Sequence, residues 1–257
     1  MNLQEIIERL KAVSDTPVLD ARLLVAYADP KELDQWVDRR LKHEPVSKII
    51  GRRGFWKSDF ITTKDVLDPR PDTEMMIEAV LESYTDRAVE KHILDIGIGS
   101  GCILYSLLDE YPKADGVGID KSKAALAIAE RNRNGRKAHL FNKDFMKPDW
   151  TNDLGMFDIV VSNPPYIPTS DIQNLEPDVC QFDPMMALDG GKDGLNAYRA
   201  LAKSIPTIIK TDGMVFLEVG IGQAKDVIAL FENNGMMKQK LHRDYGGVER
   251  IVSFKKA

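Results

Sequence analysis

The segment Asn163-Pro164-Pro165-Tyr166 holds the side chains with the most specific chemistry in this chain. It follows the apolar run 157–162, and two consecutive prolines cannot continue a sheet ladder, so the chain must leave the sheet after Asn163. The side-chain oxygen of Asn163 and the backbone carbonyl of Pro164 are both acceptors, and together they can take both N–H bonds of one planar NH2 group. Tyr166 adds a flat face for a planar substrate. The segment predicts a site that aims an amide or aromatic amino nitrogen at an electrophile, although a strand end with a plain Pro-Pro stop would look the same.

A second candidate site lies upstream, where the strand-like run 92–96 ends in alternating glycines and a helix-like run follows. The turn comprises Gly97, Ile98, Gly99, Ser100 and Gly101. Glycines let the backbone approach a ligand, and the N–H groups at the start of the following helix face that ligand. A dinucleotide fingerprint would have its third glycine one position later, where this chain has Cys102. The spacing therefore favours a nucleotide-like ligand and weakens the case for a pyrophosphate.

Two later strand ends carry groups suited to a nucleoside. Asp120 ends the run 116–120, and a carboxylate there can accept from both hydroxyls of a ribose. The run 138–143 leads into Asp144 and Phe145, and the ring of Phe145 could hold an adenine. Each residue alone would also suit an ordinary solvated strand end. Three consecutive strand ends with nucleoside-type contacts favour one shared site.

Beyond Pro69, helix-like and strand-like runs alternate. Helices are expected near 72–84, 101–110, 122–133, 195–209 and 223–234, and strands near 92–97, 116–120, 138–143, 157–162, 213–219, 237–243 and 249–255. This alternation predicts an α/β fold with a seven-stranded, mostly parallel, doubly wound sheet and ligands at the carboxyl ends of its strands. Residues 244–248 are too few for a helical crossover, so the last two strands should form an antiparallel hairpin.

The N-terminal part has a different pattern. Apolar residues at helical spacing predict helices near 3–13, 20–28 and 31–41, and the mixed segment 45–69 predicts a hairpin connector. We therefore expect a small helical domain with its connector at 1–69 and a larger domain at 70–257. The segment from Arg39 to Lys57 contains seven basic residues and a single acidic one, Glu44. It could dock an acidic surface or an RNA backbone, although a solvated connector is the favoured interpretation.

Composition excludes several classes of function. The 257 residues, 43% of them hydrophobic, can bury one large core with a small appendage, and the net charge of −5 argues against binding duplex nucleic acid through its phosphates. Cys102 and Cys180 lack metal-ligand spacing, as do the four histidines, so no metal site is expected. A chain with only two cysteines suggests a reducing compartment, and no apolar run approaches membrane-spanning length, so we expect a cytoplasmic protein without membrane contact.

Taken together, these motifs resemble the class I methyltransferases that bind S-adenosylmethionine and methylate a planar NH2 nitrogen. Within that superfamily the chain resembles the release factor glutamine methyltransferases. Further segments that resemble the family lie at 51–56, 69–74, 183–195, 217–223 and 243–245. The resemblance covers nearly the whole chain.

The resemblance implies a role for each motif. Residues Gly97 to Gly101 would line the amino-acid and ribose side of S-adenosylmethionine, Asp120 would take the ribose hydroxyls and Phe145 would pack on the adenine. Asn163 and the Pro164 carbonyl would hold the acceptor NH2, with Asn163 also next to the cofactor, and Pro165 and Tyr166 would shape the substrate slot.

The resemblance also implies the reaction and the partner. The substrate would be the glutamine in the Gly-Gly-Gln loop of class 1 peptide chain release factors, and the cofactor product S-adenosylhomocysteine. We expect a monomer that forms no stable complex with nucleic acid. One alternative is a methyltransferase acting on adenine or guanine of DNA or ribosomal RNA, which would use the same Asn-Pro-Pro-Tyr segment but for which the chain has no room for a target-recognition domain. A second is a binding module that has lost catalysis, which would keep the glycine turn but which the intact Asn163 disfavours.

The chain departs from the family in three places. The region 20–44 is shorter than the helical bundle that the family carries there and that helps to grip the release factor, so one or two helices should be missing. Asp68 precedes Pro69 where an aliphatic residue or threonine is more usual, and Phe145 replaces a common tryptophan.

Overall fold

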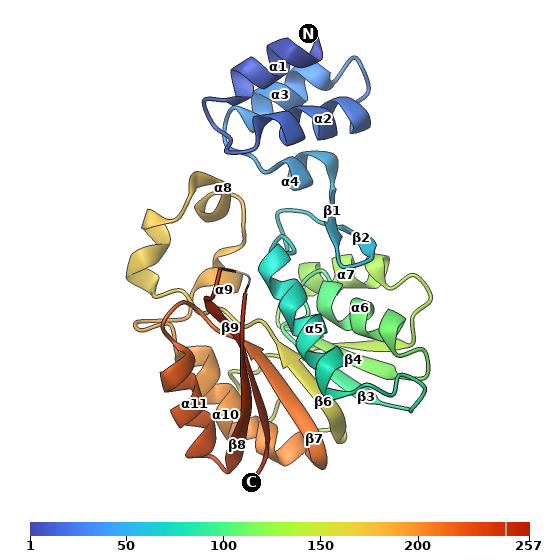
Figure 1. Cartoon of the computed structure of the whole chain (residues 1–257), viewed down its shortest axis with the longest axis vertical. Helices are drawn as coiled ribbons and strands as arrows, with labels where there is room; N and C mark the ends of the chain where they lie inside the picture. Colours follow the sequence, from blue (N-terminus) through green and yellow to red (C-terminus); the bar gives the residue numbers. More distant parts are fainter. Residues whose placement is uncertain (245) are drawn as a thin grey trace.

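The computed structural model describes residues 1–244 and 246–257, so Tyr245 at the end of the 243–245 segment lies outside the described residues. A twisted sheet flanked by helices forms the larger part of the molecule, and a cluster of short helices formed by the N-terminal residues stands above it (Figure 1). The cluster and the sheet are joined by a two-stranded hairpin. Among the described residues, no helix is both long and apolar enough to cross a membrane.

The main sheet has seven strands in the order β5-β4-β3-β6-β7-β9-β8. The strands are β3 (His92–Ile96), β4 (Asp115–Asp120), β5 (Ala138–Asn142), β6 (Phe157–Ser162), β7 (Ile209–Glu218), β8 (Met236–Arg243) and β9 (Glu249–Lys256). The first five are parallel, whereas β9 runs antiparallel to both β7 and β8. The predicted doubly wound sheet with its antiparallel C-terminal hairpin is therefore confirmed. Strand β7 begins four residues earlier than expected, because Ile209 pairs with Phe157 before the register shifts.

Helices cover both faces of this sheet (Figure 1). One face carries α5 (Glu74–Ser83), α6 (Cys102–Glu110) and α7 (Lys123–Asn132), and the other carries α10 (Asn196–Ile208) and α11 (Ala224–Glu232). Side chains of β6 alternate between the two cores: Ile159 and Val161 pack toward the first set of helices and Val160 toward the second. A strand buried on both faces reads as a continuous apolar run, which is the pattern seen at 157–162.

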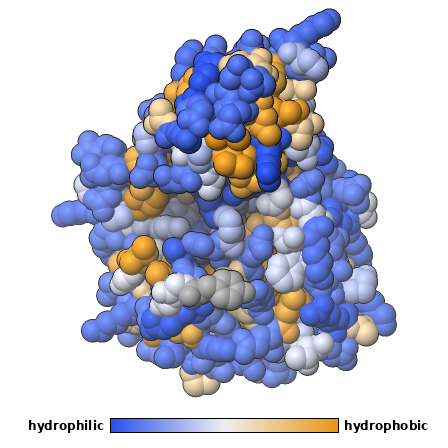
Figure 2. All heavy atoms as spheres, turned by 45° about the horizontal axis from the view of Figure 1, so that its top comes forward, coloured by the Kyte–Doolittle hydropathy of each residue, from blue (hydrophilic) through white to orange (hydrophobic). Residues whose placement is uncertain are grey.

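The helical cluster has a small core of its own. Its helices are α1 (Leu3–Leu10), α2 (Pro17–Tyr27), α3 (Leu33–Arg40) and α4 (Val46–Ile50). The first three confirm the predicted helices, whereas α4 was not predicted, because five residues are too few to show a helical period. A buried ion pair between Arg40 Nε and Asp20 Oδ2, 2.8 Å apart, ties α3 to α2. Apolar side chains also reach the surface of the cluster (Figure 2), among them Val18, Leu19, Val25 and Tyr27 of α2.

The predicted hairpin connector is present as β1 (Arg52–Phe55) and β2 (Ser58–Ile61), which pair antiparallel. Phe55 and Phe60 are buried and belong to the core between the sheet and α5, α6 and α7. The hairpin thus packs on the sheet, while α1 to α4 pack on one another. The division of the chain at residues 69 and 70 stays a prediction.

Most of the basic side chains between Arg39 and Lys57 have acidic partners within the chain. Arg39 pairs with Glu44 at 2.5 Å, Arg40 with Asp178 as well as Asp20, Lys48 with Asp183 and Lys57 with Glu110. These pairs neutralise much of the positive charge locally. They favour a structural connector over a basic docking surface.

Candidate functional site

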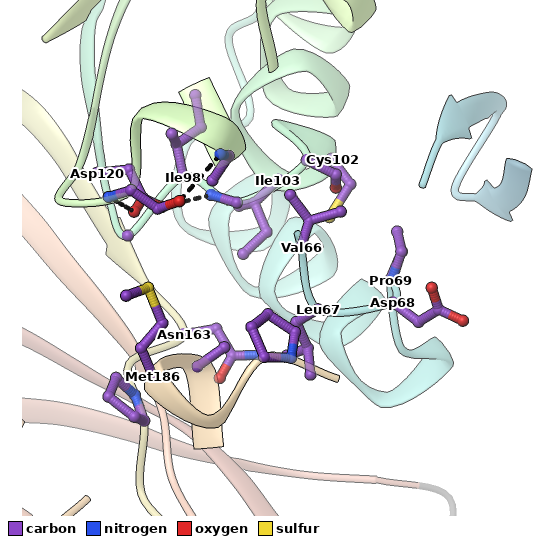
Figure 3. Close-up of a pocket in the computed structure, with 18 of the residues that line it drawn as sticks. Val66, Leu67, Asp68, Pro69, Ile98, Cys102, Ile103, Asp120, Asn163 and Met186 are labelled. Carbon is purple, nitrogen blue, oxygen red and sulfur yellow. Dashed lines mark hydrogen bonds between the residues drawn. The ribbon is translucent and has the colours of Figure 1, made fainter. Parts of the chain in front are cut away.

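The order of the sheet reverses between β3 and β6, and every motif predicted to act lies at this point. In doubly wound sheets such a switch opens a crevice outside the carboxyl ends of the strands. The glycine turn follows β3, Asp120 ends β4 and Asn163 follows β6. Residues 97–100 of the turn, Asp120 and Asn163 line one cavity (Figure 3).

The glycine turn adopts a backbone that other residues rarely take. The φ angles of Gly97, Gly99 and Gly101 are 77°, 54° and 86°. A Cβ atom on Gly101 would lie 2.3 Å from the ring of Tyr105. The N–H of Gly97 donates to the carbonyl of Ile119 at 2.9 Å, which holds the start of the turn against the neighbouring strand. The turn therefore presents bare backbone to the cavity.

Asp120 is held by two backbone donors. Its Oδ2 accepts from Gly99 N at 3.1 Å and its Oδ1 from Ser122 N at 2.8 Å. Each oxygen keeps a lone pair for a further donor. Burial raises the pKa of Asp120, and the two backbone N–H bonds oppose that rise. The carboxylate is thus fixed in place and able to accept from two hydroxyls.

The remaining walls of this cavity are mostly apolar. Phe145 lines it together with Ile98, Ile103 and Ala125. Figure 3 shows Ile103 and Val66 on one side of the space, with Asn163 and Met186 across from them. An apolar slot beside a fixed carboxylate is suited to a flat base joined to a ribose.

Two segments without a predicted role close the cavity. Residues 65–70 form one wall, and residues 184–187, which overlap α9 (Met185–Leu188), contribute to another. Asp68, the departure from the family pattern, lies buried and points away from the slot, where it accepts from Thr62 Oγ1 at 2.6 Å and lies 3.5 Å from Lys48 Nζ. The buried lysine accommodates the unusual acid.

A second cavity lies on the other side of Asn163. The residues common to both cavities form the wall between them: Leu67, Arg70, Asn163 and Ala187. The second cavity is further lined by Tyr166, Glu218 and Arg250. Of the predicted substrate residues, Pro165 faces the first cavity and Tyr166 the second. Pro164 and Gly101 are buried beside these cavities and contribute to neither wall.

Asn163 joins a chain of buried polar groups. Its Nδ2 donates to Thr73 Oγ1 at 3.2 Å, and the Thr73 hydroxyl donates to Glu218 Oε2 at 2.6 Å. The hydroxyl of Tyr166 lies 3.4 Å from the other oxygen of Glu218. Burial raises the pKa of Glu218 to about 7 and, with the nearby Glu218 charge, also raises the pKa of Tyr166.

Tyr166 is held from its backbone side as well. Gln223 Nε2 donates to its carbonyl at 2.9 Å, and a Cβ on Gly194 would come within 2.3 Å of the same oxygen. These contacts give a physical reason for the glycine and glutamine of the 183–195 and 217–223 segments. They fix the ring at the edge of the second cavity.

Asp95, at the end of β3, is a further buried acid close to the site. Its Oδ2 accepts from Leu104 N at 3.2 Å, while no described residue bonds its Oδ1. Burial raises the pKa of Asp95 to about 7. Over residues 1–244 and 246–257, no group of three or more His, Cys, Asp or Glu side chains is arranged to hold a metal ion.

Sequence reasoning missed Thr73, Glu218 and Arg250. Thr73 lies 90 residues before Asn163, and its only signal was its place in the 69–74 segment. Glu218 ends an apolar strand that neighbours β6, so its position at a carboxyl end was visible, but its pairing with Thr73 was not. Long-range contacts of this kind carry no local pattern.

The fold and the site define a class I methyltransferase. Its sequence matches the family model described as Methyltransferase small domain over residues 64–176. Two solved structures share the fold at 17% identity. A methyltransferase from Pyrococcus furiosus has a TM-score of 0.56 and covers 88% of this chain and 99% of its own, and the ribosomal protein L11 methylase from Lactobacillus delbrueckii has a TM-score of 0.53 and covers 74% and 82%.

Curated relatives identify the family. The release factor glutamine methyltransferase of Rhodospirillum rubrum is 45% identical over 234 residues, covering 89% of this chain and 70% of the relative. That of Caulobacter vibrioides is 42% identical over 272 residues, covering 95% of this chain and 92% of the relative. The chain belongs to the release factor glutamine methyltransferase family.

Proposed function

We propose that this protein transfers a methyl group from S-adenosylmethionine to the side-chain amide nitrogen of the glutamine in the Gly-Gly-Gln motif of class 1 peptide chain release factors. The observation that carries the proposal is the position of Asn163. It stands in the wall between a nucleoside-type cavity and a second, partly polar cavity, so a donor on one side and an acceptor on the other would meet at this residue.

The first cavity fits S-adenosylmethionine. The Gly97 to Gly101 turn offers bare backbone for the amino-acid end, the lone pairs of Asp120 suit two ribose hydroxyls, and Phe145 with the apolar wall suits adenine. S-adenosylmethionine supplies an electrophilic methyl group on a sulfonium sulfur and leaves as S-adenosylhomocysteine. Phe145 serves here in place of the more usual tryptophan because its ring also offers a flat apolar face.

The second cavity suits the acceptor amide. Asn163 Oδ1, in the wall that both cavities share, and the carbonyl of the next residue, Pro164, would accept the two N–H bonds of the glutamine NH2. Pro165 on the side of the first cavity and Tyr166 on the side of the second would hold the amide plane. An amide nitrogen is a weak nucleophile because its lone pair is delocalised. Two fixed acceptors turn that lone pair toward the methyl group, so the rate comes from orientation and from polar groups that need no rearrangement. The nitrogen becomes acidic as its new bond to carbon forms, and it then releases a proton to water without a strong base.

The helical cluster is the proposed docking surface for the release factor. Exposed apolar side chains gather on α2 (Figure 2), and such patches mark protein contacts more often than chance exposure does. A nucleic-acid substrate is less well supported, because the chain carries a net charge of −5 and its basic segment is largely paired internally.

The test uses the full chain with labelled S-adenosylmethionine and a recombinant class 1 release factor. Mass spectrometry should place the added methyl group on the Gly-Gly-Gln glutamine. Asn163→Ala should lower kcat by about 100-fold or more, because one of the two fixed acceptors is lost. The matched control is Asn233→Ala, a substitution at the end of α11 away from the site.

Ribosomal RNA and DNA are assayed in parallel. Label on nucleic acid alone would overturn the substrate while leaving the methyl donor unchanged. Label on a release factor residue other than that glutamine would overturn the acceptor geometry. Full activity in Asn163→Ala would show that Asn163 has no role in the reaction.

A further inference from the structure

We propose that Thr73 and Glu218 are positioning residues that lock the amide of Asn163 with its oxygen toward the acceptor cavity, and that this lock makes the site select an amide acceptor over a carboxylate. The inference rests on the proposed function, since it concerns how that site recognises the NH2 group of glutamine. Neither residue belongs to the Asn-Pro-Pro-Tyr segment or to the glycine turn.

The three side chains come from three separate elements. Asn163 follows β6, Thr73 ends η1 (Pro71–Thr73) and Glu218 ends β7. Glu218 is 2% exposed and Thr73 3% exposed. The bond between Thr73 and Glu218 is therefore buried, and a buried bond of this kind is costly to break, whereas the bond between Asn163 and Thr73 is partly buried. The backbone of Glu218 is also fixed, since Tyr198 donates its hydroxyl to the Glu218 carbonyl at 2.7 Å.

The direction of each bond follows from the donors that are available. An ionised Glu218 can only accept, so the single proton of the Thr73 hydroxyl must point to Glu218 Oε2. The Thr73 oxygen then has only lone pairs to offer Asn163, and only the Nδ2 end of that amide can donate to it. The Oδ1 end is left for the ligand. The negative charge of Glu218, which is linked to Asn163 through two hydrogen bonds, thus decides which end of the Asn163 amide faces the substrate.

Protonation of Glu218 would remove this constraint. A neutral carboxyl can donate to Thr73, whose hydroxyl could then donate to Oδ1 of a rotated Asn163 amide. That amide would present its NH2 end to the cavity, where the NH2 of an acceptor glutamine would meet a donor instead of an acceptor. The charged and titratable groups around Glu218 are Tyr166, Tyr198, Cys102, Arg70, Asp72 and Arg250, with Asp244 bonded to Arg250. Burial raises the pKa of Glu218 to about 7, and Thr73 and Arg250 oppose the rise.

The same lock explains selection against glutamate. A carboxylate has no N–H to give, so it would face two acceptors, Asn163 Oδ1 and the Pro164 carbonyl, without a partner for either. An amide free to rotate would offer its NH2 end to that carboxylate. Loss of the lock should therefore weaken glutamine as an acceptor and strengthen glutamate as a competitor.

The experiment compares Thr73→Val with Thr73→Ser. Valine keeps the shape of threonine but has no hydroxyl, whereas serine keeps the hydroxyl. Each variant is assayed with a class 1 release factor as substrate, and with the same factor carrying glutamate at the acceptor position as inhibitor. Thr73→Val should lower kcat by about 10- to 100-fold. It should also lower the inhibition constant of the glutamate factor by about 10-fold, which corresponds to one hydrogen bond. Thr73→Ser should recover most of both changes.

Three further measurements separate the lock from general damage. The wild-type kcat should rise with pH as Glu218 ionises, and this dependence should flatten in Thr73→Val and in Glu218→Gln. The affinity for S-adenosylmethionine and the unfolding midpoint report whether each variant is folded and binds its cofactor.

The outcomes are distinct. If Thr73→Val and Thr73→Ser lose the same activity, or if the glutamate factor inhibits Thr73→Val no better than wild type, the lock is overturned while the proposed function stands. If the wild-type protein methylates no release factor, the proposed function fails before any variant is compared.

Discussion

Lys48 Nζ lies 2.8 Å from Asp183 Oδ1, and the two side chains are 3% and 1% exposed. Lys48 belongs to α4 of the helical cluster, and Asp183 precedes the segment 184–187 that helps to close the first cavity. Arg70, in the wall between the cavities, also pairs with Asp183 at 2.6 Å. One buried charge cluster therefore connects the N-terminal helices to both cavities.

Replacing Lys48 should destabilise the fold. Lys48→Met should lower the free energy of unfolding by about 3 kcal/mol, because it leaves buried carboxylates without this partner. It also removes the donor to the carbonyls of Thr63 and Val66. Urea denaturation measures the change. Lys240→Met is the matched control: its partner Glu82 is 58% exposed, so it should cost less than about 1 kcal/mol. Equal costs for the two variants would contradict the buried role of Lys48.

Asp120 should control affinity for the methyl donor. Asp120→Asn should raise the Kd for S-adenosylmethionine by about 10-fold or more, because hydrogen bonds to a charged group contribute about 1.5–3 kcal/mol. The asparagine NH2 would also face the N–H of Gly99 or Ser122. Calorimetry measures the Kd. Asp115→Asn, at the opposite end of the same strand, should leave the Kd within about 2-fold of wild type, and a parallel loss there would rule out a specific role for Asp120.

Substitution by alanine should destabilise the protein more at Gly101, in the glycine turn, than at Gly135, which has a similar backbone conformation. Gly135 has φ 78° and open space around its Cβ position, so Gly135→Ala should cost about 1 kcal/mol for the left-handed backbone alone. Gly101→Ala should cost at least about twice as much, because the new Cβ would also displace Tyr105. Thermal unfolding of the two variants compares them. A larger shift for Gly135→Ala would contradict the close packing at Gly101.

Asp95 should make the protein less stable as pH rises. Its pKa is raised to about 7 in the folded state, against an ordinary value of about 4. Between these values the folded protein keeps a proton that the unfolded chain has lost, so the free energy of unfolding falls with rising pH by up to about 1.4 kcal/mol per pH unit for this group. Asp95→Asn cannot titrate, and its slope between pH 4 and 7 should be shallower. Glu218 acts in the same direction and keeps part of the slope.

Urea denaturation at several pH values measures this slope. Asp193→Asn is the control, since Arg199 lowers the pKa of Asp193 to about 2, below the window. An unchanged slope in Asp95→Asn relative to the wild-type protein would show that Asp95 is already ionised across this pH range, against the raised pKa.

Much of the fold could be predicted because it depends on local patterns. The run 157–162 is apolar because both faces of β6 are buried, and Pro164 and Pro165 mark its end. Residues 244–248 are too few for a crossover, which fixed the direction of the last strand. The short elements α4, α8 (Pro177–Cys180) and α9 have five residues or fewer, so they show no periodicity and were missed.

The site was only half predictable for a similar reason. Residues placed by a strand end, such as Asp120 and Asn163, could be found from the sequence. Thr73 and Glu218 act through contacts across 90 and 145 residues of chain, and a polar residue with such a partner looks the same as one that faces water. The basic segment was ambiguous because one acidic partner of Arg40, Asp178, and one of Lys48, Asp183, lie more than a hundred residues away.

The anchoring of the β1–β2 hairpin determines how far the helical cluster lies from Asn163. Phe55 and Phe60 are part of the main core, so the hairpin that leads from the helical cluster is anchored to the sheet. A partner that rests on α2 must then present its glutamine at one particular span from Asn163. The distance between α2 and Asn163 would then select substrates by the length of their loop. A loop of the wrong length would fail to reach the slot even if its own sequence were correct.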